Sequence, residues 1–108
     1  MNTTVIAEVK ILPMGTGQPG VSHLIADCVS LLDGAKDITW QVTPMATVIE
    51  GPLERILELA AKMHELPFSK GVQRVVTTIN IDDRRDKKIT MNGKVKAVEE
   101  KLGEAGKA

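Results

Sequence analysis

The sequence predicts an α+β fold, a four-stranded antiparallel sheet with two helices on one face. Three observations lead to this class. The chain has 108 residues, about the size of one domain, and 43% of them are hydrophobic, which is typical of globular proteins. Segments of strand period and of helix period follow in the order strand, helix, strand, strand, helix, strand. Chains with this βαββαβ order fold as a ferredoxin-like sandwich, and we expect residues 1–102 to form that single domain.

The first strand and helix have distinct periods. Apolar side chains alternate over residues 3–12, which predicts a strand, and the Gly- and Pro-rich segment 13–20 ends it. Apolar residues then recur at helical spacing, which predicts a helix over residues 21–33. We expect Ser22 to offer its hydroxyl to the first turn and Gly34 to take the left-handed conformation at the end.

A hairpin and a second helix follow. Residues 38–43 and 47–50 predict two strands joined by a tight turn. The pair Gly51-Pro52 opens the second helix, because proline is favoured at the first helical position. We expect Pro67 to end this helix.

The last third of the chain predicts a strand, a solvated run and a short helix. Residues 72–81 alternate as a fourth strand, and the charged run 82–88 suits an exposed turn. Apolar spacing predicts a short C-terminal helix over residues 92–102. We expect residues 103–108 to form a frayed tail.

The sheet face away from the two helices is not uniformly polar. Ile6 and either Leu12 or Val76 lie among charged and polar residues of the first and fourth strands. Because exposed apolar patches mark contact surfaces, we expect a dimer or tetramer that covers this face.

Composition disfavours several classes of function. Lys and Arg number 14, as do Asp and Glu, so the net charge of zero gives no field that attracts nucleic acid or a membrane. Trp40 and Phe68 are the only aromatic residues besides histidine, too few to stack bases on a sheet. The single Cys28 allows no intrachain disulfide, and the N-terminus does not resemble a signal peptide. We therefore expect a cytoplasmic protein.

Residues Gly15-x-Gly17-x-x-Gly20 lie between a strand and a helix, as in a dinucleotide-binding fingerprint. A glycine-rich turn is the favoured interpretation, because Pro19 interrupts the motif and the chain is too short for two mononucleotide halves. A small nucleotide- or phosphate-binding protein that uses this loop remains an alternative function.

The sequence offers no recognisable catalytic or metal motif. His23 and His64 lie on different predicted helices without the spacing of a metal site, although His23 is kept as a candidate ligand contact. Cys28 falls on an apolar helix stripe, where a buried thiol is inert. No nucleophile motif is present, so we expect no enzyme activity and no metal.

The predicted hairpin carries the richest set of binding groups. Trp40, the hydroxyl of Thr47 and the carboxylate of Glu50 suit a cationic aromatic heterocycle. On the residues alone, the structural interpretation is favoured: Trp40 in the core, Thr47 in the turn and Glu50 at a helix N-terminus.

Short motifs in a fixed order resemble a known family, the small thiamine-binding proteins of the UPF0045 (DUF77, YkoF-like) type. The motifs are Ala7-Glu8, Pro13-x-Gly15, Pro44-Met45-x-Thr47-x-x-Glu50-Gly51, Gly71-x-x-Arg74-Val75, Ile81-Asp82-Asp83-Arg84 and Lys94-Val95. The resemblance covers nearly the whole chain. One departure is His23-Leu24 after Ser22, where relatives often carry an aromatic residue.

The resemblance implies a ferredoxin-like dimer or tetramer that binds thiamine or its pyrimidine without catalysis and without a cofactor. Glu8 or Glu50 would accept from the 4′-amino group or offset the thiazolium charge, while Thr47 and Ser22 would orient polar edges. Trp40 would stack on a ring, and His23 and Arg74 complete the expected contacts. We expect the pocket at a subunit contact. A module that only assembles and binds no small ligand is the remaining alternative.

Overall fold

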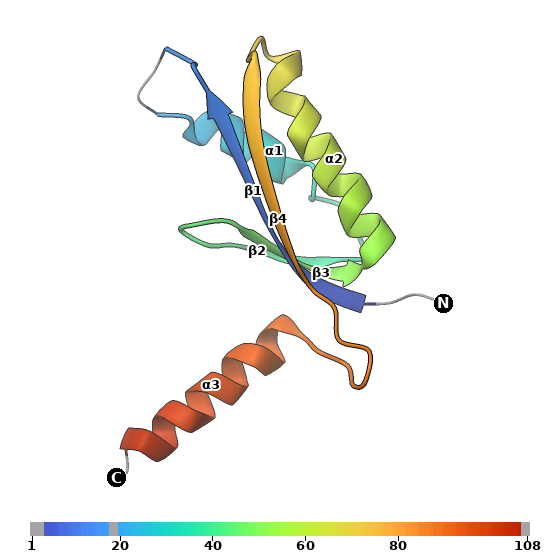
Figure 1. Cartoon of the computed structure of the whole chain (residues 1–108), viewed down its shortest axis with the longest axis vertical. Coiled ribbons are helices and arrows are strands. Elements are labelled where there is room, and N and C mark those ends of the chain that lie inside the picture. Colours follow the sequence, from blue (N-terminus) through green and yellow to red (C-terminus); the bar gives the residue numbers. More distant parts are fainter. Residues whose placement is uncertain (1–3, 18–19, 107–108) are drawn as a thin grey trace.

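The computed structural model describes residues 4–17 and 20–106 and shows one sheet with two helices packed against it and a third that projects away (Figure 1). All strand pairs are antiparallel, in the order β2-β3-β1-β4. This small α+β architecture is consistent with a ferredoxin-like fold. The elements are β1 (Thr4–Met14), α1 (Ser22–Ser30), β2 (Thr39–Val42), β3 (Thr47–Pro52), α2 (Leu53–Ser69), β4 (Arg74–Asp82) and α3 (Met91–Gly106).

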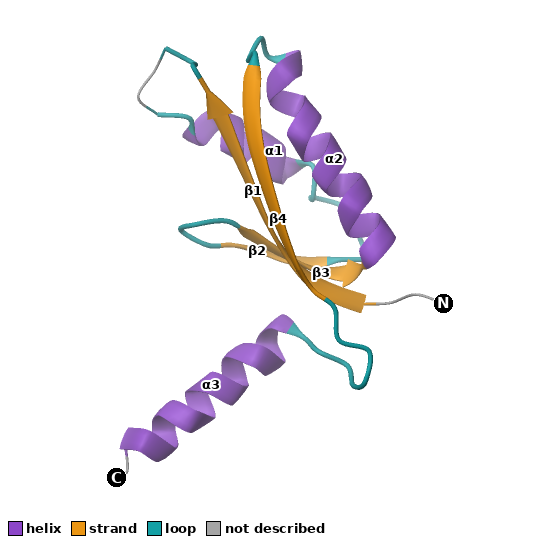
Figure 2. Cartoon of the chain, in the orientation of Figure 1, coloured by secondary structure: helices purple, strands orange, loops and turns teal. Residues whose placement is uncertain are grey.

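The core lies between one face of the sheet and the helices α1 and α2 (Figure 2). Burial of a large aliphatic side chain contributes about 1.5–3 kcal/mol, so this layer supplies most of the stabilising energy. The alternation of β1 places every second side chain here, as its period predicts. The core members from β1 are Val5, Ala7, Val9 and Ile11, and those from the helices include Cys28, Ile56, Leu59 and Met63.

β1 is longer than its neighbour β3. β3 pairs with β1 from Thr4 to Val9, whereas β4 pairs with it from Ile6 to Met14. The strand therefore continues through Pro13, which the sequence analysis placed in the following loop. Beyond Val9, no described strand pairs with the β3 side of β1.

The boundaries of α1 differ from those predicted. Val21 is the N-cap, without a side-chain hydrogen bond, and Ser22 is already the first helical residue, so the predicted capping by Ser22 is wrong. The helix ends at Ser30 because i→i−3 bonds such as Leu32 N–H to Val29 O (2.9 Å) tighten the chain into turns. Gly34, with φ of +81°, ends these turns in the expected left-handed conformation.

The predictions for the two prolines at the start and near the end of α2 are wrong. Pro52 is the extended N-cap residue and still belongs to β3, so the helix begins at Leu53. Pro67 does not end the helix, which continues to Ser69. A proline in the last turn keeps helical φ and leaves one carbonyl, that of Met63, without its usual N–H donor. The Cys28 thiol supplies a donor to that carbonyl instead.

α3 is longer than the predicted helix and projects away from the sheet (Figure 1). It continues to Gly106, past the predicted end at residue 102, and an ion pair between Lys101 and Glu104 spans that predicted end. Residues 107 and 108 lie outside the described part of the chain. None of the helices described has the length and apolar character needed to cross a membrane.

Candidate ligand-binding site

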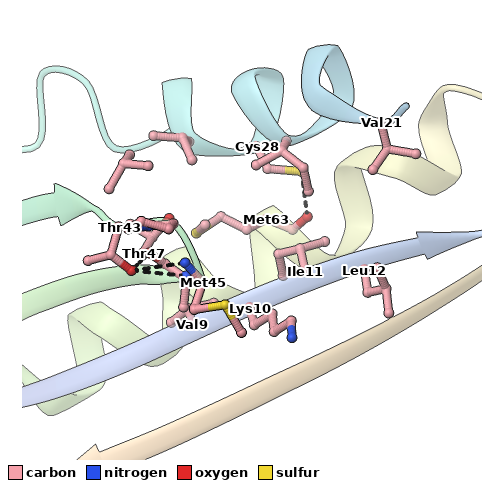
Figure 3. A pocket seen from close by; sticks show the side chains of 15 residues that line it. Val9, Lys10, Ile11, Leu12, Val21, Cys28, Thr43, Met45, Thr47 and Met63 are labelled. Atoms are coloured by element: carbon pink, nitrogen blue, oxygen red, sulfur yellow. Dashed lines mark hydrogen bonds between the residues drawn. The ribbon is translucent and has the colours of Figure 1, made fainter. Parts of the chain in front are cut away.

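A cleft of about 220 Å³ opens beside β1, between the first helix and the turn of the β2–β3 hairpin (Figure 3). We call it the hairpin cleft. It exists because β3 stops pairing with β1 at Val9, so the hairpin turn stands apart from the second half of β1. Its lining comes from residues 9–12 of β1, Val21, Ile25, Cys28 and Val29 at α1, residues 42–47 of the hairpin, and Met63 of α2.

The walls of the hairpin cleft are mainly apolar, and few polar side chains reach it. Among the described residues that line the cleft, Lys10 is the charged one and none is a carboxylate. The Thr43 hydroxyl is used within the turn, where it donates to Ala46 O (2.8 Å) and accepts from the N–H groups of Ala46 (3.1 Å) and Met45 (3.3 Å). The Thr47 side chain is buried, and no described group hydrogen-bonds its hydroxyl. Thr47 is thus the lining hydroxyl left to a ligand.

Cys28 forms part of the cleft wall and behaves as a core residue, as predicted. It is 1% exposed, and its Sγ donates to Met63 O at 3.4 Å. Burial raises the pKa of the Cys28 thiol, and the neighbouring Asp27 carboxylate raises it further. The thiol is therefore protonated near neutral pH and a poor nucleophile.

Of the predicted hairpin contacts, Thr47 lines the cleft, and Trp40 and Glu50 do not. Trp40 is half-buried on β2 and packs against the core. Glu50 lies on the other face of the sheet, because it is an odd number of residues from Thr47 along β3. There its Oε1 accepts from the Met91 N–H at 2.8 Å.

Glu8 also lies on the sheet face away from α1 and α2. Its Oε1 accepts from Asn80 Nδ2 across the β1–β4 ladder at 3.1 Å. A shallow groove of about 390 Å³ runs beside it, lined by Glu8, Asn80, Asp82 and Lys94 together with apolar neighbours. This groove is separate from the hairpin cleft and shares no lining residue with it.

Ser22, His23 and Arg74 complete the predicted set and lie outside both depressions. Ser22 and His23 are exposed in the first turn of α1. His23 borders a third pocket that is also lined by Asp27 and Lys70, whose side chains approach to 3.9 Å. Arg74 is exposed and faces Met14 across the ladder. The structure does not bring the seven predicted residues together.

Two glycines of the glycine motif have left-handed backbone. Gly15 and Gly17 have φ of +66° and +74°, a conformation that glycine adopts without strain. Pro19 of the motif lies outside the described residues. The described part of the chain holds no cluster of His, Cys, Asp and Glu suited to a metal ion.

Lys10, Ile11 and Met45 line the cleft but were not predicted as site residues. Lys10 and Ile11 read as ordinary strand positions, and Met45 as a turn residue. The hairpin turn itself was predicted. Its separation from β1 could not be, because no pattern in the local sequence indicates it.

Comparison with known proteins decides the family. Residues 7–99 match the sequence model of the thiamine-binding protein family. A UPF0045 protein of Staphylococcus xylosus is 49% identical over 104 residues, which cover 94% of this chain and 97% of the relative. The chain belongs to the thiamine-binding protein family.

Solved structures agree with this membership of the thiamine-binding protein family. The crystal structure of protein MJ1052 from Methanocaldococcus jannaschii superposes with a TM-score of 0.81 at 35% identity, covering 91% of this chain and 98% of that one. A Thermotoga maritima protein, named as a candidate for thiamine biosynthesis or salvage, gives a TM-score of 0.71 at 20% identity and covers 88% of this chain and 98% of its own. At that identity, the second likeness supports the fold alone.

Proposed function

We propose that this protein binds thiamine or a thiamine-related pyrimidine in the cytoplasm and does not change it chemically. The observation that supports this most is the hairpin cleft itself: a mainly apolar depression with one unused hydroxyl, in a chain of the thiamine-binding family. Small-molecule sites have this character, with apolar walls and a few placed polar groups.

The size of the cleft limits what enters it. Sites for drug-sized ligands occupy about 300–1,000 Å³. The hairpin cleft, at about 220 Å³, is smaller and suits a single heterocyclic ring. The rest of a thiamine molecule would then extend past the rim.

The rim favours a site completed by a second copy of the chain. Leu12, Val42 and Met45 line the cleft and are 40%, 55% and 70% exposed. Apolar side chains gathered around one opening are a feature of contact surfaces. A dimer or tetramer that covers this rim would enclose the part of the ligand that projects from the cleft.

The groups that line the cleft support binding without catalysis. General acid–base work needs a group whose pKa lies near the working pH, and nucleophilic work needs an activated side chain. Here the lining thiol has a raised pKa, and the lining residues that the structure describes include no imidazole and no carboxylate.

Calorimetric titration with thiamine tests the proposal. Val42→Trp places an indole in the cleft at a side chain that is 55% exposed, so the fold should tolerate it. We expect at least a tenfold loss of affinity. Val98→Trp on α3 is the matched control, at a valine that is 60% exposed and away from the cleft, and it should bind normally.

The outcomes separate the alternatives. Full affinity in Val42→Trp with loss in Val98→Trp would move the site to the surface of α3. No binding by the unaltered, self-associated protein would favour the assembly module without a small ligand.

A further inference from the structure

The second half of β1 has a free edge beside the hairpin cleft. Its ladder with β4 runs on to Met14, while its ladder with β3 ends at Val9. In an antiparallel ladder, each residue directs its N–H and C=O to the same side, and successive residues alternate sides. Either the odd-numbered or the even-numbered residues of β1 therefore direct their N–H and C=O to the free side.

Three features determine which of these two sets faces the free side. Pro13 faces Val75 in the β4 ladder and has no N–H, which suits a residue whose backbone groups point away from β4. Pro52, also without an N–H, faces Thr4, so the hydrogen-bonded pairs with β3 start at Val5. In the turn, Thr43 N–H donates to Ala46 O at 2.8 Å, so Ala46 faces β2 and the next residue faces β1.

All three features agree that odd-numbered residues of β1 point toward the β3 side. Val9 uses this direction to pair with Thr47. Ile11 is the next residue with the same direction, and β3 no longer reaches it. Its backbone N–H and C=O therefore point away from β4, at the free edge.

The lining of the cleft shows that it lies at this edge. Val9 and Ile11 face the helices, whereas Lys10 and Leu12 face the opposite side of the sheet. All four line the same cavity. A cavity that touches both faces of a strand lies beside the strand, so the Ile11 backbone faces the cleft.

We propose that the N–H and C=O of Ile11 recognise the amidine-like edge of a 4-aminopyrimidine, an inference that rests on the proposed function. The N–H would donate to a ring nitrogen, and the C=O would accept from the exocyclic amino group. A strand residue presents one donor and one acceptor side by side, and an aminopyrimidine presents the complementary pair. Thr47 lines the same cleft, and its unused hydroxyl would give a further contact.

The same geometry disfavours an added peptide strand. β-Augmentation needs a row of donors and acceptors along the edge. Here the next residue that faces the free side, Pro13, has no N–H, so Ile11 offers a single complete pair. One pair and about 220 Å³ suit a ring rather than a strand.

The charge of the cleft sets the orientation of thiamine. Lys10 is the charged residue in the described lining, which holds no carboxylate to offset the positive thiazolium ring. Like charges disfavour proximity. The neutral aminopyrimidine should enter the cleft and the thiazolium should point outward.

Amide hydrogen exchange by NMR on the full-length protein tests this assignment. In the free protein, we expect the N–H groups of Lys10 and Leu12 to be protected by β4 and that of Ile11 to exchange quickly. Addition of 4-amino-5-hydroxymethyl-2-methylpyrimidine should slow Ile11 exchange at least tenfold. The thiazole alcohol that forms the other half of thiamine should leave it unchanged.

Backbone ester substitution provides a matched pair of variants. Replacement of the Ile11 amide by an ester removes the N–H but keeps the side chain, and should weaken pyrimidine binding roughly tenfold. The same change at Leu12 removes a donor to β4, so it should lower stability and leave affinity in the folded protein intact. If the pyrimidine binds but Ile11 exchange is unchanged, or if the Ile11 ester binds it with the affinity of the natural protein, the assignment to Ile11 is overturned and the proposed function still stands. Absence of binding by thiamine and by both its halves would overturn the proposed function as well.

Discussion

The Cys28 thiol donates a hydrogen bond to the backbone carbonyl of Met63 across the α1–α2 interface, with 3.4 Å between Sγ and O. Within α2 this carbonyl would normally accept from the N–H four residues on, but that residue is Pro67, which has none. The side chain of one helix thus satisfies a backbone group that a proline leaves open in the other.

A double-mutant cycle tests this coupling. Cys28→Ala should lower the free energy of unfolding by about 1–3 kcal/mol, because it leaves a small void and an unpaired buried carbonyl. In a Pro67→Ala background the restored N–H of residue 67 donates to the Met63 carbonyl. Cys28→Ala should then lower the free energy of unfolding by roughly 0.5–1 kcal/mol less than it does in the natural protein. Urea unfolding of the four proteins measures the difference, and strict additivity would refute the coupling.

The raised pKa of Cys28 predicts a pH dependence of stability. In the unfolded chain the thiol ionises at its ordinary pKa, whereas the folded protein holds it protonated to higher pH. This contribution is complete below the unfolded pKa and is lost as the pH rises toward the folded pKa. We expect the unfolding free energy to fall more steeply above about pH 9 in the natural protein than in Cys28→Ala.

The same burial predicts slow labelling of Cys28. Ellman's reagent should react with the native protein far more slowly than with the unfolded chain, because little thiolate is present and the side chain is 1% exposed. A ligand in the hairpin cleft should slow the reaction further, since Cys28 lines the cleft. Immediate stoichiometric labelling of the native protein would contradict this prediction.

Glu50 should stabilise the first turn of α3 and should not contact the ligand. The carboxylate accepts the Met91 N–H, and Thr90 Oγ1 accepts the Gly93 N–H at 2.9 Å, so together they satisfy two donors of the first turn. Glu50→Ala should lower stability by about 1–2 kcal/mol, and Glu50→Gln by less, because an amide oxygen still accepts. Chemical denaturation measures both changes.

Thiamine affinity provides the control for Glu50. We expect Glu50→Gln and Glu8→Gln to bind with unchanged affinity, since neither side chain lines the hairpin cleft. A tenfold loss in either variant would move the site to the other face of the sheet.

Two glycine-to-alanine changes should have opposite signs. A Cβ on Gly51 would lie 2.8 Å from Ile38 Cγ2 and 3.1 Å from Asp37 O, so Gly51→Ala should cost about 1–3 kcal/mol. Gly103 lies within α3 with open space around it, and Gly103→Ala should stabilise that helix by about 0.5–1 kcal/mol. Thermal unfolding compares the two, and a neutral Gly51→Ala would argue against the close packing of this segment.

The apolar rim of the cleft predicts self-association. Met45→Ser should reduce the fraction of dimer or tetramer in native mass spectrometry, because it removes a 70% exposed apolar side chain from the proposed contact. Leu57→Ser on α2, at a side chain that is 43% exposed and outside the cleft, is the control. A natural protein that remains monomeric at tens of micromolar would contradict the proposed shared site.

The order and type of the strands and helices were predictable, because each depends on a local period of apolar residues. The family resemblance read from short motifs was also confirmed. Helix boundaries at Ser22 and Pro52 were missed by one residue, and the prediction for Pro67 failed because it considered the local sequence alone. Pro67 reads as a helix end, yet the helix continues past it while a thiol from α1 serves the open carbonyl.

The candidate site shows the same division. Thr47 was identified from the hairpin sequence, but Glu50 was grouped with it, although the two-residue period of β3 puts these two side chains on opposite faces of the sheet. The cleft itself depends on where β3 stops along β1, which is fixed by the pairing of Val9 with Thr47, residues far apart in the chain. Strand register is set by contacts between whole strands and by the turns that join them, so only the tertiary structure decided that the Ile11 backbone is left free.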